Sequence, residues 1–158
     1  MAMLRLSKLT DYAVVVLIRL AEADGGIVQT SPGIAGATGV PEPTVAKVLK
    51  ALAAGDLVIS LRGARGGYRL ARDLDAISVG DVIRAIDGPI ALTACVDGAI
   101  GGCDVQDRCA VKGRWDVVNH AIQQALATIS LAEMRRAAIP FAFRVPEFLP
   151  AITASAAE

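Results

Sequence analysis

Apolar residues in the first third of the chain recur every three to four positions, the spacing of one face of an α-helix. This pattern predicts three helices, at about residues 10–22, 31–38 and 41–55. Ser7 or Thr10 would cap the first, and Ser31 would cap the second with Pro32 at its first helical position. Helix, short helix, glycine-containing turn and helix is the helix-turn-helix arrangement, whose last helix can enter a DNA major groove.

A β-branched run follows at 57–61, then a glycine-rich stretch at 62–67 and a second short strand at 68–71. A hairpin placed directly after a helix-turn-helix predicts a wing. Arg62, Arg65, Arg69 and Arg72 lie in or beside it without an intervening acidic residue. Arginine suits contacts to phosphates and to narrow minor grooves. The alternative is a solvated hairpin whose charges keep an edge strand soluble. The position of the hairpin directly after the third helix favours DNA binding.

The second half predicts a short helix, a loop and a long helix. Ser78 and Asp81 form a capping-box variant before a helix that ends at Gly88-Pro89. Glycines and aspartates then predict a loop over about 92–109. A helix predicted from about 109 to 139, stopped by Pro140, has apolar residues alternately four and three apart, at Val111, Trp115, Val118, Ile122, Ala125, Ile129 and Ala132. This heptad pattern favours pairing with a second copy over packing inside its own domain.

The predicted fold class is therefore mainly α with a small β wing, a winged helix-turn-helix domain plus a long dimerisation helix. We expect the DNA-binding domain at 1–88, a cysteine-containing loop at 89–109, the dimerisation helix at 110–139 and a flexible tail at 140–158.

The distribution of charge indicates that the two halves of the chain have different roles. The chain of 158 residues has no net charge, but residues 1–72 carry nine Lys/Arg against five Asp/Glu, and 73–158 carry seven against eleven. The alternative is chance scatter of surface charge; the asymmetry favours an N-terminal surface for a polyanion. The longest apolar run, 13–18, is too short to span a bilayer. A cytoplasmic protein is expected, and no nucleophile–base constellation indicates an enzyme.

The three cysteines, Cys95, Cys103 and Cys109, all lie within fifteen residues of one another. An odd number of thiols in a reducing compartment argues against a disulfide framework. Soft thiolates on a glycine-rich loop suit an iron–sulfur cluster. Spacings of seven and five intervening residues are wider than the paired knuckles of structural zinc sites. Zinc, unliganded sensor thiols and buried structural cysteines remain as alternatives.

Three segments together resemble the Rrf2 family of dimeric bacterial winged-helix regulators, many of which hold an iron–sulfur cluster. They are LRLSKLTDYA at 4–13, RGARGGYRL at 62–70, and ISVGDVIRAI at 77–86 before Gly88-Pro89. The N-terminal run, together with CAVKGRW at 109–115, is most similar to regulators of the SUF iron–sulfur assembly operon. The resemblance implies a homodimer that binds double-stranded operator DNA, is a repressor of cluster-assembly genes, and has no membrane partner.

The resemblance also implies that Cys95, Cys103 and Cys109 ligate the cluster, with 2Fe–2S favoured over 4Fe–4S. Some relatives place a histidine three residues after the third cysteine, where this chain has Lys112. The single histidine, His120, is about 16 Å further along a helix and too far away.

The fourth position is then open, filled by Asp104 or Asp107, or supplied across the dimer. In the nitric-oxide-sensing branch of the family an aspartate at the place of Asp11 ligates the partner chain's cluster; the alternative role of Asp11 is to complement the helix dipole.

DNA-reading residues follow partly from the resemblance. Arg62 and Arg65 match wing positions that approach the minor groove, and Thr44, Lys47 and Lys50 are polar residues of the third helix that could meet bases or phosphates. Relatives can have a base-discriminating glutamate where this chain has Ala46, so an operator sequence is not transferred. Two alternative functions are a nitric-oxide or redox-sensing regulator with a 4Fe–4S cluster, and a thiol redox or metal-storage protein with a vestigial winged helix.

Overall fold

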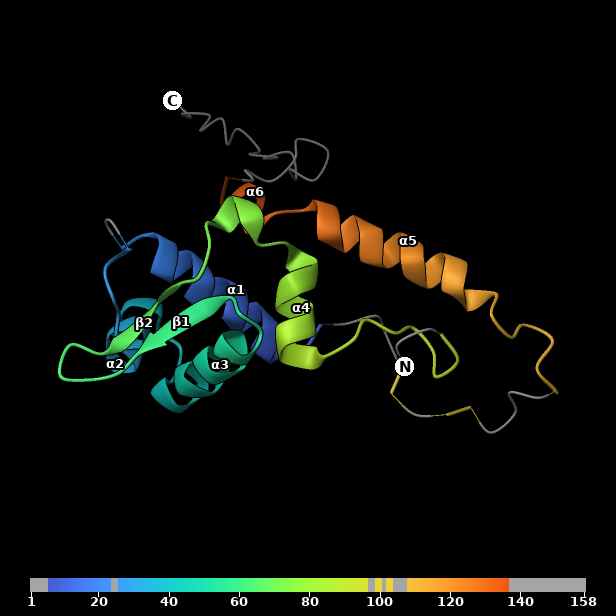
Figure 1. The fold of residues 1–158 in the computed structure, drawn as a ribbon, viewed down its shortest axis with the longest axis horizontal. Helices are drawn as coiled ribbons and strands as arrows, with labels where there is room; N and C mark the ends of the chain where they lie inside the picture. Colours follow the sequence, from blue (N-terminus) through green and yellow to red (C-terminus); the bar gives the residue numbers. More distant parts are fainter. Residues whose placement is uncertain (1–5, 24–25, 97–98, 101, 104–107, 137–158) are drawn as a thin grey trace, which may run out of the picture.

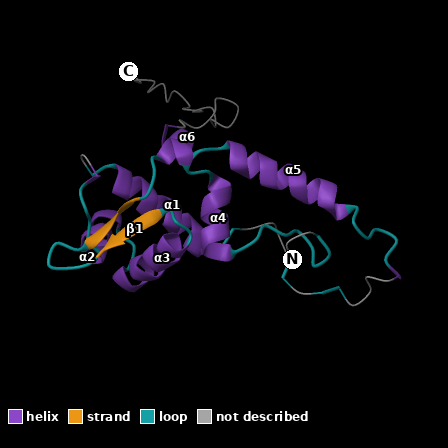
Figure 2. Cartoon of the chain, in the orientation of Figure 1, coloured by secondary structure: helices purple, strands orange, loops and turns teal. Residues whose placement is uncertain are grey.

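The computed structural model describes residues 6–23, 26–96, 99–100, 102–103 and 108–136 (Figure 1). Its elements are α1 (Lys8–Ala21), α2 (Ser31–Thr38), α3 (Glu42–Ala54), β1 (Val58–Leu61), β2 (Gly67–Leu70), the 3-10 helix η2 (Leu74–Ala76), α4 (Val79–Asp87), α5 (Trp115–Thr128) and α6 (Leu131–Arg136). The predicted fold class is confirmed: helices dominate, and the sheet of the described residues is one two-stranded hairpin (Figure 2). The predicted tail at 140–158 and Pro140 lie outside the described residues.

The core lies where α1, α3 and α4 meet, and its apolar side chains come from the predicted helical faces. On α3 the buried positions are Val45, Val48, Leu49 and Leu52, one stripe at helical spacing. Leu17 of α1 and Ile34 of α2 are also fully buried. Burying each of these side chains contributes about 1.5–3 kcal/mol. They form the core of the part of the chain from α1 to α4, residues 8–87, which we call the head.

The starts of α1, α2 and α4 follow the sequence with one correction. Ser7 caps α1, and Ser78 with Asp81 forms the full capping box of α4. The cap of α2 is Thr30 and not Ser31: the Thr30 hydroxyl accepts a hydrogen bond from the backbone N–H of Gly33 at 3.3 Å. Ser31 is therefore the first helical residue and Pro32 the second, where a missing N–H is tolerated because the first N–H groups of a helix have no partner within it.

Two glycines make the wing possible. A Cβ on Gly66 would lie 2.5 Å from the carbonyl oxygen of Leu61, and one on Gly67 would lie 2.6 Å from that of Gln29. Gly67 also has a φ of 153°, a conformation that side chains disfavour. Gln29 pairs with Tyr68 through two backbone hydrogen bonds of 2.9 and 2.8 Å, which covers the outer edge of β2 at that point.

The long helix predicted for 109–139 is interrupted. Residues 110–114 form turns, α5 ends at Thr128, and Ile129 is extended before α6 begins. Ser130 starts α6 with a capping box: its backbone N–H donates to the Glu133 carboxylate at 2.8 Å, and the Glu133 N–H donates to the Ser130 hydroxyl at 3.2 Å. The prediction of one continuous helix was therefore wrong. The apolar spacing on which it was based continues past Ile129 and Ser130, where the helix is interrupted.

A short backbone pairing attaches the end of α5 to the head. The N–H of Val79 donates to the carbonyl of Ile129, and the N–H of Leu131 donates to that of Ile77, both at 2.9 Å. Beside this pairing, Gly80 of α4 is buried against the backbone of Leu126 on α5. A Cβ added to Gly80 would lie 3.5 Å from that backbone, which is an ordinary van der Waals contact. From this attachment α5 projects away from the other helices (Figure 1).

Gly80 gives a graded test of the α4–α5 contact. Gly80→Ala should leave the free energy of unfolding unchanged or raise it by up to about 1 kcal/mol, since a methyl fits and alanine favours helix. Gly80→Leu should lower it by about 1–3 kcal/mol through overpacking. Urea denaturation measures both, and Gly36→Leu is the control because a Cβ there meets open space. Equal effects at both positions would contradict the close approach.

The capping box of α6 predicts a pH-dependent term. Hydrogen bonds from Ser130, with a smaller effect of Arg136, lower the pKa of Glu133. A lowered pKa stabilises the folded chain above the ordinary pKa of glutamate, and this stabilisation is lost as pH falls through the folded-state pKa. Glu133→Ala should therefore lower the thermal midpoint at pH 7, and the difference should shrink well below about pH 4. A difference that does not change with pH would contradict the assignment.

Candidate nucleic-acid interface and cysteine loop

The outer face of α3 carries the predicted DNA-reading residues. Lys47 and Lys50 are exposed, and Thr44 is half-buried one turn before Lys47. They lie at steps of three along the helix, opposite the apolar stripe that faces the core. The outer face of α3 is therefore cationic and accessible, and the packing of the opposite, buried face fixes the position of the helix.

The wing presents two further cations beside α3. Arg62 and Arg65 are both exposed at the tip, which closes with a hydrogen bond of 2.9 Å from the N–H of Gly66 to the carbonyl of Gly63. The register pairs Leu61 with Gly67, so the tip consists of the five residues 62–66. The wing tip and α3 lie at the same end of the described chain (Figure 1). Fold and sequence thus bring four cations to one end.

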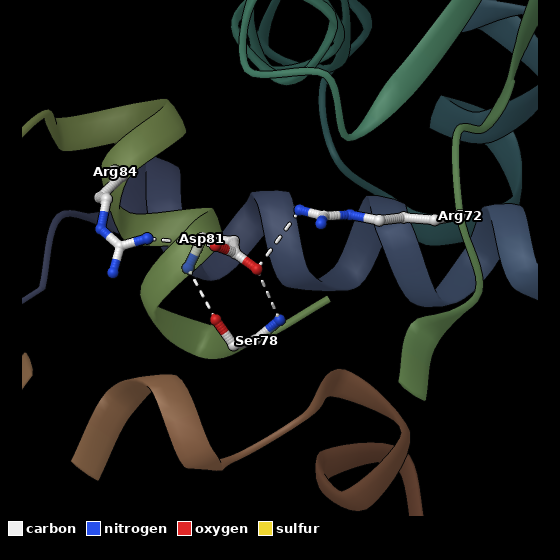
Figure 3. A network of polar contacts seen from close by, with 4 residues as sticks. All are labelled: Arg72, Ser78, Asp81 and Arg84. Carbon is white, nitrogen blue, oxygen red and sulfur yellow. Dashed lines mark hydrogen bonds and ion pairs between the residues drawn. The ribbon is translucent and has the colours of Figure 1, made fainter. Parts of the chain in front are cut away.

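Arg72, at the root of the wing, is engaged elsewhere. Its guanidinium donates to the Asp81 carboxylate at 3.3 Å, and Arg84 donates to the other oxygen at 3.2 Å (Figure 3). Asp81 also accepts a hydrogen bond from the backbone N–H of Ser78 at 3.0 Å. Each exposed ion pair contributes little alone. Together they attach the chain after β2 to the first turn of α4.

The cysteines occupy the irregular segment between α4 and α5, as predicted. Cys95, Cys103 and Cys109 are free and half-buried, and the Thr93 hydroxyl lies 3.3 Å from the Cys95 sulfur. Among the described residues, which omit parts of this segment, no three His, Cys, Asp or Glu side chains are placed to hold a metal ion together. The soft donor set fits an iron–sulfur cluster. The three thiols are not gathered around one point in this conformation.

One side of α5 holds the first part of this segment, which we call the cysteine loop (residues 89–114). Asn119 is 2% exposed and bonds the backbone of Ile90 and Leu92, and Gln123 bonds Ile90 as well. Sequence reasoning missed both residues. A polar position beside an apolar stripe is usually solvated, and only its backbone partners distinguish it.

The candidates for a fourth ligand lie in different places. Asp11 is exposed on the first turn of α1. Its neighbour Thr10 is buried and donates a hydrogen bond of 2.7 Å to Asp87 at the end of α4, where the cysteine loop departs. Lys112 and His120 are both exposed. Asp104 and Asp107 lie outside the described residues.

The apolar stripe of α5 faces outward. Trp115 and Val118 are 42% and 43% exposed, and Ala125 is exposed while Ile122 is half-buried. Of the other predicted seam positions, Ala132 is 2% exposed and belongs to the core through α6. The stripe therefore covers about two heptads of one helix, and it is not packed inside the described chain.

No helix of the described residues is both long and apolar enough to cross a membrane.

Comparison with known proteins identifies relatives of this arrangement. The Rrf2 family profile, described as "Iron-dependent Transcriptional regulator", matches residues 6–137. The HTH-type transcriptional regulator IscR of Sodalis glossinidius is 33% identical over 131 residues, covering 83% of this chain and 78% of its own length.

Two solved structures share the fold. IscR of T. potens is 32% identical with a TM-score of 0.59, covering 84% of this chain and 87% of its own. CymR of B. subtilis, named the global cysteine regulator of that organism, is 28% identical with a TM-score of 0.62, covering 85% of this chain and 98% of its own.

Proposed function

This chain belongs to the Rrf2 family of DNA-binding transcriptional regulators, and from that premise we propose that it is a homodimeric repressor whose operator affinity depends on an iron–sulfur cluster. The observation that carries the proposal is the presence, on one chain, of a cationic winged helix-turn-helix and a loop with three free thiols. The regulated genes are those of iron–sulfur assembly or a related stress response, as the similarity to SUF regulators suggests.

DNA is read by α3 and the wing. Thr44 approaches base edges, Lys47 and Lys50 contact phosphates, and Arg62 and Arg65 enter the adjacent minor groove. What supports this assignment is the exposure of the four cations and the buried stripe that orients α3. Phosphate contacts position the protein, and base contacts supply specificity.

Two copies pair through the outward stripe of α5. An exposed row of Trp115, Val118 and Ala125 supports pairing, because contiguous apolar surface on a soluble chain usually marks an interface. Because α5 is shorter than the predicted helix, its apolar row spans about two heptads, and neighbouring residues must add to the buried area. Such a pair presents two reading heads to two half-sites, as operators of dimeric regulators require.

Cys95, Cys103 and Cys109 would hold the cluster, with 2Fe–2S favoured. When bound, the cluster supplies a redox-active and labile group whose gain or loss changes the charge and shape of the loop. The thiols contribute soft anionic donors, and the loop must close to gather them. Asp11 of the partner chain is the proposed fourth ligand: its exposure on α1 leaves it accessible, although a role at the helix dipole explains its position equally well.

Switching requires only a modest difference between the two states. A cluster that changes operator affinity by a few kcal/mol shifts the bound fraction from mostly free to mostly occupied. By linkage, DNA then favours the cluster state that binds it better by the same factor.

A second candidate is a regulator that senses oxidants or nitric oxide, directly at its thiols or through a 4Fe–4S cluster. It is favoured by the half-buried thiols, which stand apart in the described residues, and is compatible with the similarity to CymR, whose name refers to cysteine and not to a cluster. Its DNA-binding surface is the same, so the two candidates differ only in what occupies the loop.

The reading surface is tested by salt dependence. Lys47→Ala and Lys50→Ala should each weaken binding to all sequences and lower the salt slope of log K by about 1, whereas Arg62→Ala and Arg65→Ala should also relax sequence preference. Fluorescence anisotropy on an operator selected by the wild-type chain from random duplex DNA measures both. Arg135→Ala, an exposed cation of α6, is the control. Equal losses in all five variants would contradict the assignment.

The cluster is tested on protein purified without oxygen. Wild type should show visible sulfide-to-iron absorption, and iron and sulfide counted per chain should separate 2Fe–2S from 4Fe–4S. Each of Cys95→Ser, Cys103→Ser and Cys109→Ser should abolish cluster retention, since three-thiolate binding fails when one donor is lost. Asp11→Ala should leave a cluster that chelators remove faster. A colourless, iron-free wild type that cannot be reconstituted would favour the thiol sensor.

A further inference from the structure

One buried amide joins the cysteine loop to α5. The Asn119 side chain is 2% exposed, and both of its polar atoms bond the loop backbone. Its Oδ1 accepts from the N–H of Leu92 at 3.0 Å, and its Nδ2 donates to the carbonyl of Ile90 at 3.1 Å. Gln123, one turn later, donates to the same carbonyl at 2.9 Å. Three hydrogen bonds therefore fix the loop backbone at Ile90 and Leu92.

The position of this contact gives it a consequence for the thiols. Leu92 precedes Cys95 by three residues, and Thr93 lies between them with its hydroxyl 3.3 Å from the Cys95 sulfur. At its other end the loop enters α5 through turns, with hydrogen bonds of 3.3 Å from the N–H of Lys112 to the carbonyl of Cys109 and of 3.0 Å from Arg114 to Val111. The first part of the cysteine-bearing segment is thus bonded to side chains of α5, and its last part continues directly into α5 through turns.

Fixing the first part of the segment matters because the thiols are not gathered. Bringing Cys95 to Cys103 and Cys109 costs loop entropy, and the cost rises with the length of chain left free. The hydrogen bonds at Ile90 and Leu92 shorten that length, which would otherwise extend back to Gly88 at the end of α4. They also fix Cys95 relative to α5, into which Cys109 leads.

We infer that Asn119, supported by Gln123, is a positioning residue for the iron–sulfur cluster: it holds the first part of the loop on α5 so that three thiols can bind one group. The inference rests on the proposed function. A buried, fully bonded asparagine could serve stability alone, and the two roles separate because only the positioning role changes cluster retention without changing DNA binding by the cluster-free chain.

The test compares Asn119→Ala and Asn119→Asp with Gln124→Ala, an exposed neighbour on α5 that has no hydrogen bond to the described part of the loop. The aspartate can still accept from Leu92 but cannot donate to Ile90 when ionised. Each full-length variant is reconstituted anaerobically with ferrous iron and sulfide and then challenged with EDTA. Asn119 bonds the loop backbone and not a cysteine, so its loss acts through the length of loop left free, and a doubling of that length costs about threefold in closure. We expect cluster loss to be faster by up to about that factor in Asn119→Ala, and by at least as much in Asn119→Asp, whose buried carboxylate would face the Ile90 carbonyl.

Two further measurements make each outcome decisive. Hydrogen exchange of the Leu92 amide should rise in Asn119→Ala, and operator affinity of the cluster-free variant should equal that of cluster-free wild type. Unchanged EDTA kinetics with a deprotected Leu92 amide would overturn the inference and leave the proposed function standing. A wild type that takes up no iron would overturn the proposed function itself. Should Asn119→Ala fail to fold, Gln123→Ala gives the same comparison with a smaller perturbation, because Gln123 makes only one of the three hydrogen bonds and is half-buried.

Discussion

The rest of the structure depends on the backbone pairing between the segment before α4 and the segment after α5. Two hydrogen bonds of 2.9 Å, from Val79 to Ile129 and from Leu131 to Ile77, fix the C-terminal end of α5 on the head. Because only that end and one side of α5 are attached, the helix extends outward with its apolar stripe exposed and the cysteine loop at its far end (Figure 1). Without this pairing, α5 would be held only by its packing on α4 and its hydrogen bonds to the loop, so its direction relative to α3 would be less well fixed. Any dimer built on α5 would then have a less well fixed spacing between its two heads.

Helix α4 is where the parts meet. Its first turn contacts the root of the wing through Asp81 and Arg72 (Figure 3). Its last residue, Asp87, accepts a hydrogen bond from Thr10 of α1. Its buried face is enclosed by α1 and α3, and Gly80 lies against α5. Because protein interiors are closely packed, a rotation of α4 would disturb its contacts with α1, α3 and α5 together. The nine residues of α4 therefore link the wing, the core and the helix that carries the cysteine loop.

Much of this arrangement follows from periodicity. The apolar spacing of α1 and α3, the proline at α2 and the glycines of the wing predict their elements because each reflects a local preference. The break at Ser130 was missed because the heptad pattern passes through it, although the Ser130-to-Glu133 capping box is a local sign of a helix start. Asn119 could not be assigned, since its partners at Ile90 and Leu92 are 29 and 27 residues away in the chain. The same limit applies to the thiols: their spacing indicates chemistry, and their convergence depends on long-range contacts of the loop.

The separation of the wing tip from the cysteine loop limits how a signal at the thiols, as proposed, would reach the proposed DNA-reading face. The cysteine loop leaves the C-terminal end of α4 and runs toward the N-terminal end of α5, on the side of α4 away from the wing tip (Figure 1). Its route to that face runs either through Gly88 and Asp87 into α4 and α1, or along α5 to the pairing at Ile129. Both routes end at the hydrogen bonds and packing that orient α3 in the head. In a dimer joined through α5, a small change at the loop would alter the relative placement of two α3 helices more than the shape of either head. Two heads must match half-sites one helical turn apart, so affinity is sensitive to that placement. If the chain pairs through α5 as proposed, a signal at the thiols would therefore act by changing this placement and not by steric blocking.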